Sequence, residues 1–252
     1  MMEFEIKRPY QEIGLILRNE LIEGNYQVGQ RLPPERDIAE RLNVSRTVVR
    51  EAIIMLELDN LVEVKKGSGV YILNIPNKSS TEKMLINNDA GPFEMLQARQ
   101  LLESNIAEFA ASQVTPNDIA KMRAALALEK QELADGSNEY NGDKQFHLCI
   151  AEATQNTVLV DMLLESWQRR EMSPMWKKLH SRILNQTYRQ DWFEDHAQIL
   201  AAMQKKNPAL VKKAMWQHLE NVKQRLIELS DVDDPDFDGY LFGSNPVVHL
   251  GK

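Results

Sequence analysis

The sequence has almost no cysteine: Cys149 is the single one among 252 residues. One thiol cannot form an internal disulfide, and it excludes the zinc modules that are built from several cysteines. Any metal site must therefore use histidine and carboxylate ligands. The chain also lacks a run of about 18 apolar residues that could cross a membrane, and its charged first residues exclude a secretory signal peptide. These absences predict a cytoplasmic protein without a membrane partner.

A strong excess of one charge is also missing. The formal net charge of -7 argues against a protein that coats nucleic acid indiscriminately, but it leaves room for a locally basic surface that reads DNA. Hydrophobic residues at 43% and charged residues at 27% are typical of a folded globular chain. The length favours two domains, a small one and a larger one.

Residues 1–73 have the pattern of a winged helix-turn-helix domain. Apolar residues at helical spacing predict helices over 10–23 and 35–42, and a third helix that begins after the N-cap Ser45. Two β-rich runs then flank a basic, glycine-rich tip over 65–69, which indicates a hairpin. Three short helices and a hairpin form a winged helix-turn-helix, whose third helix enters the major groove through its N-terminal residues.

Basic and hydroxyl side chains occur where such a domain meets DNA. Arg46 and Arg50 lie four residues apart on one face of the third helix, with Thr47 between them. Guanidinium groups and a hydroxyl at these positions reach base edges and phosphates, whereas the alternative is a solvated basic face. Side chains of the second helix and the hairpin tip can reach flanking phosphates and the minor groove. The predicted DNA contacts are Arg36, Ser45, Arg46, Thr47, Arg50, Lys65, Lys66 and Gly67.

The rest of the chain predicts a linker and then helices alone. Residues 74–91 are rich in Asn, Ser, Lys and Asp with little periodicity, as expected of a linker. Residues 92–230 predict an all-α helical-bundle effector domain without a strand, and 231–252 an Asp-rich C-terminal extension of irregular structure. The predicted helices span 93–111, 116–133, 140–153, 158–171, 175–184, 192–204 and 208–229. The expected fold class is therefore mainly α.

Three histidines and one aspartate form a candidate metal site in this second domain. Asp143 and His147 stand at i and i+4, so both project from one face of a helix. His196 and His218 lie on the last two helices, on either side of a turn, and come to similar heights if those helices are antiparallel. Three imidazoles and a carboxylate can bind a divalent metal and leave coordination positions open. From spacing alone, hydrogen-bonded helix histidines remain the alternative.

Motifs of the first domain carry a family resemblance. Residues 32–36, 44–52 and 66–71 resemble the signature of the GntR family of bacterial transcriptional regulators. In that family the matching positions contact operator DNA, so the resemblance implies these roles for Arg36, Arg46, Thr47, Arg50 and Gly67. A homodimer on a pseudo-palindromic operator is expected, because one helix in one groove makes few contacts.

The second domain resembles the FCD effector domain of the fatty-acid-regulator subfamily through residues 99–103, 143–147, 195–200 and 214–218. Many members of that subfamily hold a metal ion with one aspartate and three histidines. The resemblance implies a divalent ion here, and it leaves zinc, nickel and manganese open. The implied ligands are Asp143, His147, His196 and His218.

Residues 91–110, 173–180 and 215–221 are similar to repressors of the hexuronate pathway, whose effectors are sugar acids. The resemblance implies a repressor of glucuronate, galacturonate or fructuronate metabolism. The oxygens of a hydroxy-carboxylate can fill open metal positions while an arginine pairs with the carboxylate.

We expect Arg99 to be that arginine, with Arg169 or Arg170 behind it. The alternative for Arg99 is a helix pair with Glu103 at i+4. His180 is expected to add a hydrogen bond to a sugar hydroxyl, with surface packing as the alternative.

Two other functions use the same cluster. A metal-dependent hydrolase would activate water on the ion, but no obvious general base accompanies the cluster and the DNA-binding domain would be unexplained. In a metal-ion sensor the ion itself would be the effector. We therefore expect a regulator and not an enzyme.

Overall fold

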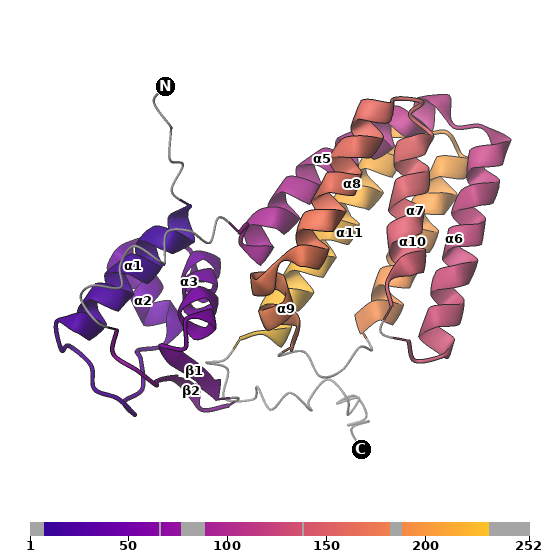
Figure 1. Ribbon diagram of the computed structural model, residues 1–252. Helices are drawn as coiled ribbons and strands as arrows, with labels where there is room; N and C mark the ends of the chain where they lie inside the picture. The colour runs from indigo at the N-terminus through magenta and orange to yellow at the C-terminus, as the bar shows by residue number, and fades with distance from the viewer. Residues whose placement is uncertain (1–7, 66, 77–88, 138, 182–187, 232–252) are drawn as a thin grey trace, which may run out of the picture. The chain divides into compact units, whose positions relative to one another are not determined.

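The computed structural model describes residues 8–65, 67–76, 89–137, 139–181 and 188–231 (Figure 1). The chain divides into two compact units. The N-terminal unit comprises Met1–Phe93, Ser173–Asn185 and Ile227–Lys252, and the bundle unit comprises Glu94–Met172 and Gln186–Leu226. Within the described ranges the regular structure is ten helices and one hairpin, which confirms the mainly α class.

The N-terminal unit contains the expected winged helix-turn-helix. Asn43 ends the second helix with a left-handed φ of 52°, and the Ser45 hydroxyl begins the third by accepting from the Val48 N–H at 3.3 Å. Its elements in chain order are α1 (Pro9–Ile22), α2 (Glu35–Leu42), α3 (Arg46–Leu58), β1 (Val62–Lys65), β2 (Gly69–Ile72) and α9 (Pro174–Ser181).

The hairpin has a third, short partner that the sequence did not predict. β1 and β2 pair in antiparallel register, with Val62 opposite Ile72. On the other edge of β2, the Leu32 N–H donates to the Val70 carbonyl at 2.8 Å and the Ile72 N–H donates to the Gln30 carbonyl at 2.9 Å. β2 is thus hydrogen-bonded along both edges, which fixes the wing to the segment before α2.

The bundle unit consists of helices in the part of the chain that the structure describes, as expected. The turn between the last two helices contains Lys206 with a φ of 48°, and the Asn207 side chain accepts from the Leu210 N–H at 3.1 Å. The helix expected over 192–204 begins four residues earlier, at Tyr188. Of the helix expected over 175–184, residues 182–184 lie outside the described residues. The helices are α5 (Pro92–Gln113), α6 (Pro116–Ala134), α7 (Asn141–Glu152), α8 (Thr157–Met172), α10 (Tyr188–Gln204) and α11 (Pro208–Leu229). The first two residues of α5 and the last three of α11 belong to the N-terminal unit.

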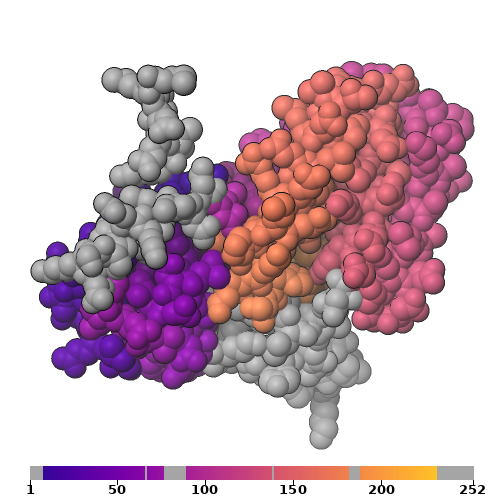
Figure 2. Space-filling view, viewed as in Figure 1, coloured from indigo at the N-terminus to yellow at the C-terminus, as the bar shows by residue number. Residues whose placement is uncertain are grey.

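The bundle unit has one apolar core. Apolar side chains from most of its helices are buried together, and on the face seen in Figure 2 side chains fill the spaces that separate the ribbons. The large buried members include Phe146, Trp167, Ile199, Met203 and Leu219. Cys149 is also a buried core residue. No described helix is long and apolar enough to cross a membrane.

A glycine sets the distance between α6 and α7. A Cβ at Gly142 would lie 2.3 Å from the backbone nitrogen of Glu129, so a larger residue would push the two helices apart. The Gly142 N–H also donates to the Glu132 carboxylate at 3.0 Å. This close approach places Asp143 and His147 of α7 beside Glu129 of α6.

A buried histidine cluster and a recognition-helix surface

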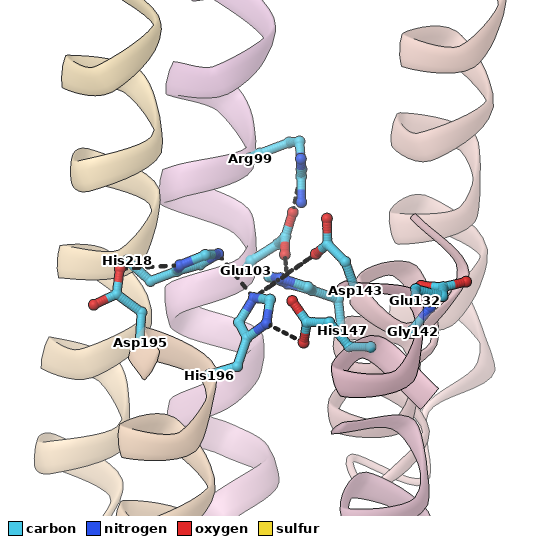
Figure 3. Close-up of polar contacts among 10 residues, drawn as sticks. Arg99, Glu103, Glu132, Gly142, Asp143, His147, Asp195, His196 and His218 are labelled. Atoms are coloured by element: carbon cyan, nitrogen blue, oxygen red, sulfur yellow. Dashed lines mark hydrogen bonds and ion pairs between the residues drawn. The ribbon is translucent and has the colours of Figure 1, made fainter. Parts of the chain in front are cut away.

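Three imidazoles from three helices of the bundle unit meet at one point (Figure 3). His147 comes from α7, His196 from α10 and His218 from α11, and all three are buried. The Nε2 atom of His196 lies 3.1 Å from Nε2 of His147 and 3.1 Å from Nε2 of His218. One nitrogen of each ring lies within 4.8 Å of the other two, which is the spacing of ligands around one ion.

Asp143 adds an oxygen to this set. Its Oδ1 lies 3.3 Å from Nε2 of His147 and 3.7 Å from Nε2 of His196. One helical turn separates Asp143 from His147, so α7 supplies both groups from one face. The structure therefore brings all four sequence-predicted metal ligands together.

Each histidine has a carboxylate at its other ring nitrogen, which the sequence analysis missed as part of the site. Nδ1 of His147 is hydrogen-bonded to Glu103. Nδ1 of His196 lies 2.9 Å from a carboxylate oxygen of Glu129, and Nδ1 of His218 lies 3.3 Å from one of Asp195. A carboxylate accepts the Nδ1 proton and thereby turns the Nε2 lone pair toward a metal. Glu103 and Asp195 lie in the motifs 99–103 and 195–200 of the family resemblance, whereas Glu129 carried no sequence signal.

These residues fit a divalent cation. With each Nδ1 proton donated to a carboxylate, three Nε2 lone pairs and a carboxylate oxygen face one another in a buried space, and such an arrangement needs a positive charge among them. Three nitrogens and one oxygen suit zinc, nickel or manganese, and they leave room for further ligands.

The pKa values of two histidines in the cluster shift in opposite directions. Burial acts to lower the pKa of His147, but Glu103 and Asp143 outweigh it and raise that pKa to about 9. Burial and the neighbouring His196 lower the pKa of His218 to about 3. A raised pKa favours a proton on His147, and a divalent ion that binds this imidazole would have to displace that proton.

Two buried arginines contact Trp167, whose ring lies 5.9 Å from that of His147 in the cluster. The guanidinium carbon of Arg99 lies 4.4 Å from a ring centroid of Trp167. The guanidinium carbon of Arg170 lies 4.7 Å from a ring centroid of the same side chain. Nε of Arg99 donates to Glu103 at 2.5 Å, so the i, i+4 pair is present. Because Glu103 also bonds His147, one carboxylate joins the arginine to the metal-ligand set.

Two tyrosines lie beside Arg170, the buried Tyr188 and the partly buried Tyr140. The hydroxyls of Tyr140 and Tyr188 lie 3.0 Å apart, and Arg170 lies 5.1 Å from the Tyr140 ring centroid. Burial raises the pKa of both hydroxyls, which therefore stay protonated and able to donate. Neither tyrosine carried a sequence signal for this site.

The remaining predicted effector contacts are Arg169 and His180. Arg169 is exposed on α8 and pairs with Glu165 at 2.6 Å, one turn away on the same helix. His180 lies on α9, which belongs to the N-terminal unit.

Most predicted DNA contacts are exposed on the N-terminal unit. The side chains of Arg36 and Lys65 are 69% and 52% exposed. Ser45 and Thr47 lie at the start of α3 with their hydroxyls 2.9 Å apart. Gly67 at the hairpin tip has a φ of 65°, which favours glycine, and Lys66 lies outside the described residues.

The two arginines of α3 differ in exposure. Arg46 is 46% exposed and pairs with Asp231, with Nη2 2.6 Å from Oδ2. Arg50 is 1% exposed and donates to Glu35 from Nε and from Nη2, the latter at 2.6 Å. In this structure Arg50 holds α3 to α2, and its predicted contact with DNA requires the side chain to leave these partners.

A winged helix-turn-helix in one chain with a helical unit that encloses a ligand-type cluster is the architecture of a DNA-binding regulator controlled by a small molecule. The chain belongs to the GntR family of bacterial regulatory proteins. The family model "Bacterial regulatory proteins, gntR family" matches residues 9–72, and that of the FCD domain matches residues 94–221. FCD domains often bind metal, in agreement with the buried histidines.

Relatives of similar length are transcriptional regulators. The chain is 59% identical over 246 residues to the Uxu operon transcriptional regulator of Escherichia coli (strain K12), covering 96% of this chain and 95% of the relative. It is 55% identical over 247 residues to the Uxu operon regulator of Haemophilus influenzae, covering 98% and 92%. It is 48% identical over 251 residues to the Exu regulon transcriptional regulator of Escherichia coli (strain K12), covering 98% and 95%. The predictions of a transcriptional regulator, and of a protein that is not an enzyme, are confirmed.

Proposed function

We propose that the chain represses operons of hexuronate metabolism, and that a sugar acid bound beside a divalent metal ion controls its affinity for operator DNA. The observation that carries this proposal is the convergence of three Nε2 atoms and the Asp143 carboxylate next to two buried arginines. Identities of 48% to 59% to regulators named for the Uxu and Exu systems support the choice of pathway.

The metal ion is zinc, nickel or manganese in this proposal, held by Asp143, His147, His196 and His218. When bound, it supplies a positive centre with open positions that attract hydroxyl and carboxylate oxygens. Glu103, Glu129 and Asp195 keep the three imidazoles in the tautomer that the ion requires.

The effector is a hexuronate such as glucuronate, galacturonate or fructuronate. Its carboxylate pairs with Arg99 or Arg170, because a guanidinium fork matches a carboxylate in geometry and charge. Arg99 is bound to Glu103 in this structure, so the effector carboxylate takes over a site that an internal carboxylate now occupies. The hydroxyls of Tyr140 and Tyr188 can donate to the sugar, and Arg169 and His180 stay predicted contacts.

The operator is a pseudo-palindromic duplex bound by a homodimer in the cytoplasm. Two copies are needed because one recognition helix makes too few base contacts for specificity. The proposed contacts to bases and phosphates are Arg36, Ser45, Arg46, Thr47, Arg50, Lys65, Lys66 and Gly67.

The test compares operator affinity of metal-loaded protein with and without each uronate, by fluorescence anisotropy. For the parent we expect a change of about 5- to 150-fold with at least one uronate, the usual range of allosteric coupling. Arg99→Ala should lose most of this change, since it removes the guanidinium that pairs with the effector carboxylate. Arg123→Ala changes an exposed arginine of the bundle unit that has no role in the proposal, and it should respond like the parent.

Metal content is measured for each variant, because Arg99 also neutralises Glu103. A parent protein that is indifferent to every uronate at saturating metal contradicts the sugar-acid proposal. A response that metal alone reproduces identifies the protein as a metal sensor.

A further inference from the structure

The last described residues of the chain bind both arginines of the recognition helix α3. Nη2 of Arg46 lies 2.6 Å from Oδ2 of Asp231. Nη1 of Arg50 donates to the Ile227 carbonyl at 2.6 Å and to the Ser230 hydroxyl at 3.0 Å, and its Nη2 lies 3.6 Å from Oδ1 of Asp231. All of these residues belong to the N-terminal unit.

These contacts have the chemistry of a phosphate contact. Ile227 lies in the last turn of α11, where carbonyl groups lack amide partners within the helix and carry partial negative charge. Residues 227–231 therefore offer a carbonyl, a hydroxyl and a carboxylate to two guanidinium groups. The phosphate oxygens of a DNA backbone carry similar negative charge and can bind the same two guanidinium groups.

We propose that residues 227–231 form a latch that competes with operator DNA for Arg46 and Arg50. A guanidinium edge that holds the Asp231 carboxylate cannot hold a phosphate in the same place, so the operator must displace the latch before these arginines reach it. The burial of Arg50 and Ser230, at 1% and 0% exposure, shows that the latched arrangement is closely packed. The sequence adds four more aspartates between 232 and 238, which increases the negative charge of the same stretch.

The latch has two measurable consequences. The apparent operator affinity of the parent equals the affinity of the unlatched protein multiplied by the fraction of molecules that are unlatched. The salt dependence is also reduced, because Arg46 exchanges one anionic partner for another and releases fewer counterions when it binds a phosphate. Both consequences are independent of any sugar acid.

The experiment uses full-length, metal-saturated protein without sugar acid and a duplex selected from a random-sequence library by the parent chain. Asp231→Asn removes the charge that pairs with Arg46 while it keeps the side-chain shape. We expect this variant to bind the duplex about two- to fivefold more tightly, the range of a partly exposed ion pair. Its plot of log K against log salt should be steeper by about one unit.

Two further variants control the comparison. Glu165→Gln makes the same change of net charge at the exposed Arg169 pair and should match the parent in affinity and slope. Asp231→Glu keeps the charge and should bind less tightly than Asp231→Asn. Thermal midpoints show that each variant is folded.

The latch is overturned if Asp231→Asn binds the duplex no more tightly than the parent and Glu165→Gln. It is also overturned if Asp231→Glu gains as much affinity as Asp231→Asn, because the charge would then be irrelevant.

Discussion

Single side chains fix the protonation of the histidine cluster. Glu129 bonds Nδ1 of His196, and His196 occupies the centre of the cluster because its Nε2 lies 3.1 Å from both other imidazoles. The carboxylate therefore controls which nitrogen of the central ligand faces an ion. Such outer carboxylates raise the basicity of the ligand as well as orienting it.

Glu129→Gln should weaken metal binding by about 10- to 100-fold, because a neutral amide accepts the Nδ1 proton less well than a carboxylate. The affinity is measured by competition with a chromophoric zinc chelator. Glu152→Gln is the matched control, since Glu152 is exposed and pairs with Lys121 at 2.9 Å. Equal zinc affinity for Glu129→Gln and the control would show that Glu129 does not tune the ligand.

Glu103 links the arginine Arg99 to the histidine cluster. It bonds both Arg99 and His147, and these two partners outweigh the effect of burial and lower its pKa to about 2. An effector carboxylate that takes Arg99 would leave Glu103 with His147 alone. Effector binding and metal binding are therefore coupled through one side chain in this account.

At the scale of elements, the close packing of α6 and α7 holds the site together. Gly142 allows the approach, and the two helices bring Glu129, Asp143 and His147 to one place. The packing of two helices thus determines the geometry of ligands and orienting carboxylates at once.

Gly142→Ala should lower the free energy of unfolding by about 1 to 3 kcal/mol, because the new methyl group meets backbone atoms of α6 that cannot move alone. Zinc affinity should fall as well. Urea titration with and without zinc measures both effects, and Asn141→Ala, an exposed neighbour on α7, serves as control. If Gly142→Ala is as stable as this control, the approach of α6 and α7 is not limiting.

Helical periodicity predicted the elements well and the contacts between distant elements only in part. Ser45 and Asn43 marked helix ends through local chemistry, so α2 and the start of α3 were predicted to the residue. The pairing of Glu129 with His196 joins residues 67 positions apart, and no local pattern encodes it. The burial of Arg50 likewise depends on Glu35 and on Ile227 and Ser230, which lie 177 and 180 positions away. Arg50 was expected on the DNA-binding surface but is buried in this structure.

The four metal ligands were an exception among long-range contacts. Asp143 and His147 share a helix face, and His196 and His218 flank a short turn, so local geometry limited their arrangement. The identification of a metal site still required the family resemblance, because histidines on inner helix faces also occur as simple hydrogen-bonding groups.

Regulation of the molecule by a sugar acid requires two states of the protein that differ in affinity for both operator and sugar acid. A ligand shifts an equilibrium only by its differential affinity for the two states. The DNA-binding residues belong to the N-terminal unit and the histidine cluster belongs to the bundle unit, so regulation must pass from one unit to the other.

Isothermal titration of uronate into metal-loaded protein, alone and with saturating operator duplex, measures the coupling between the two sites. If a uronate changes operator affinity by a given factor, linkage requires the operator to change the affinity for that uronate by the same factor, about 5- to 150-fold. We predict this reciprocal change for at least one of glucuronate, galacturonate and fructuronate. Uronate binding of equal affinity with and without operator, or no uronate binding to the metal-loaded protein, would contradict the account.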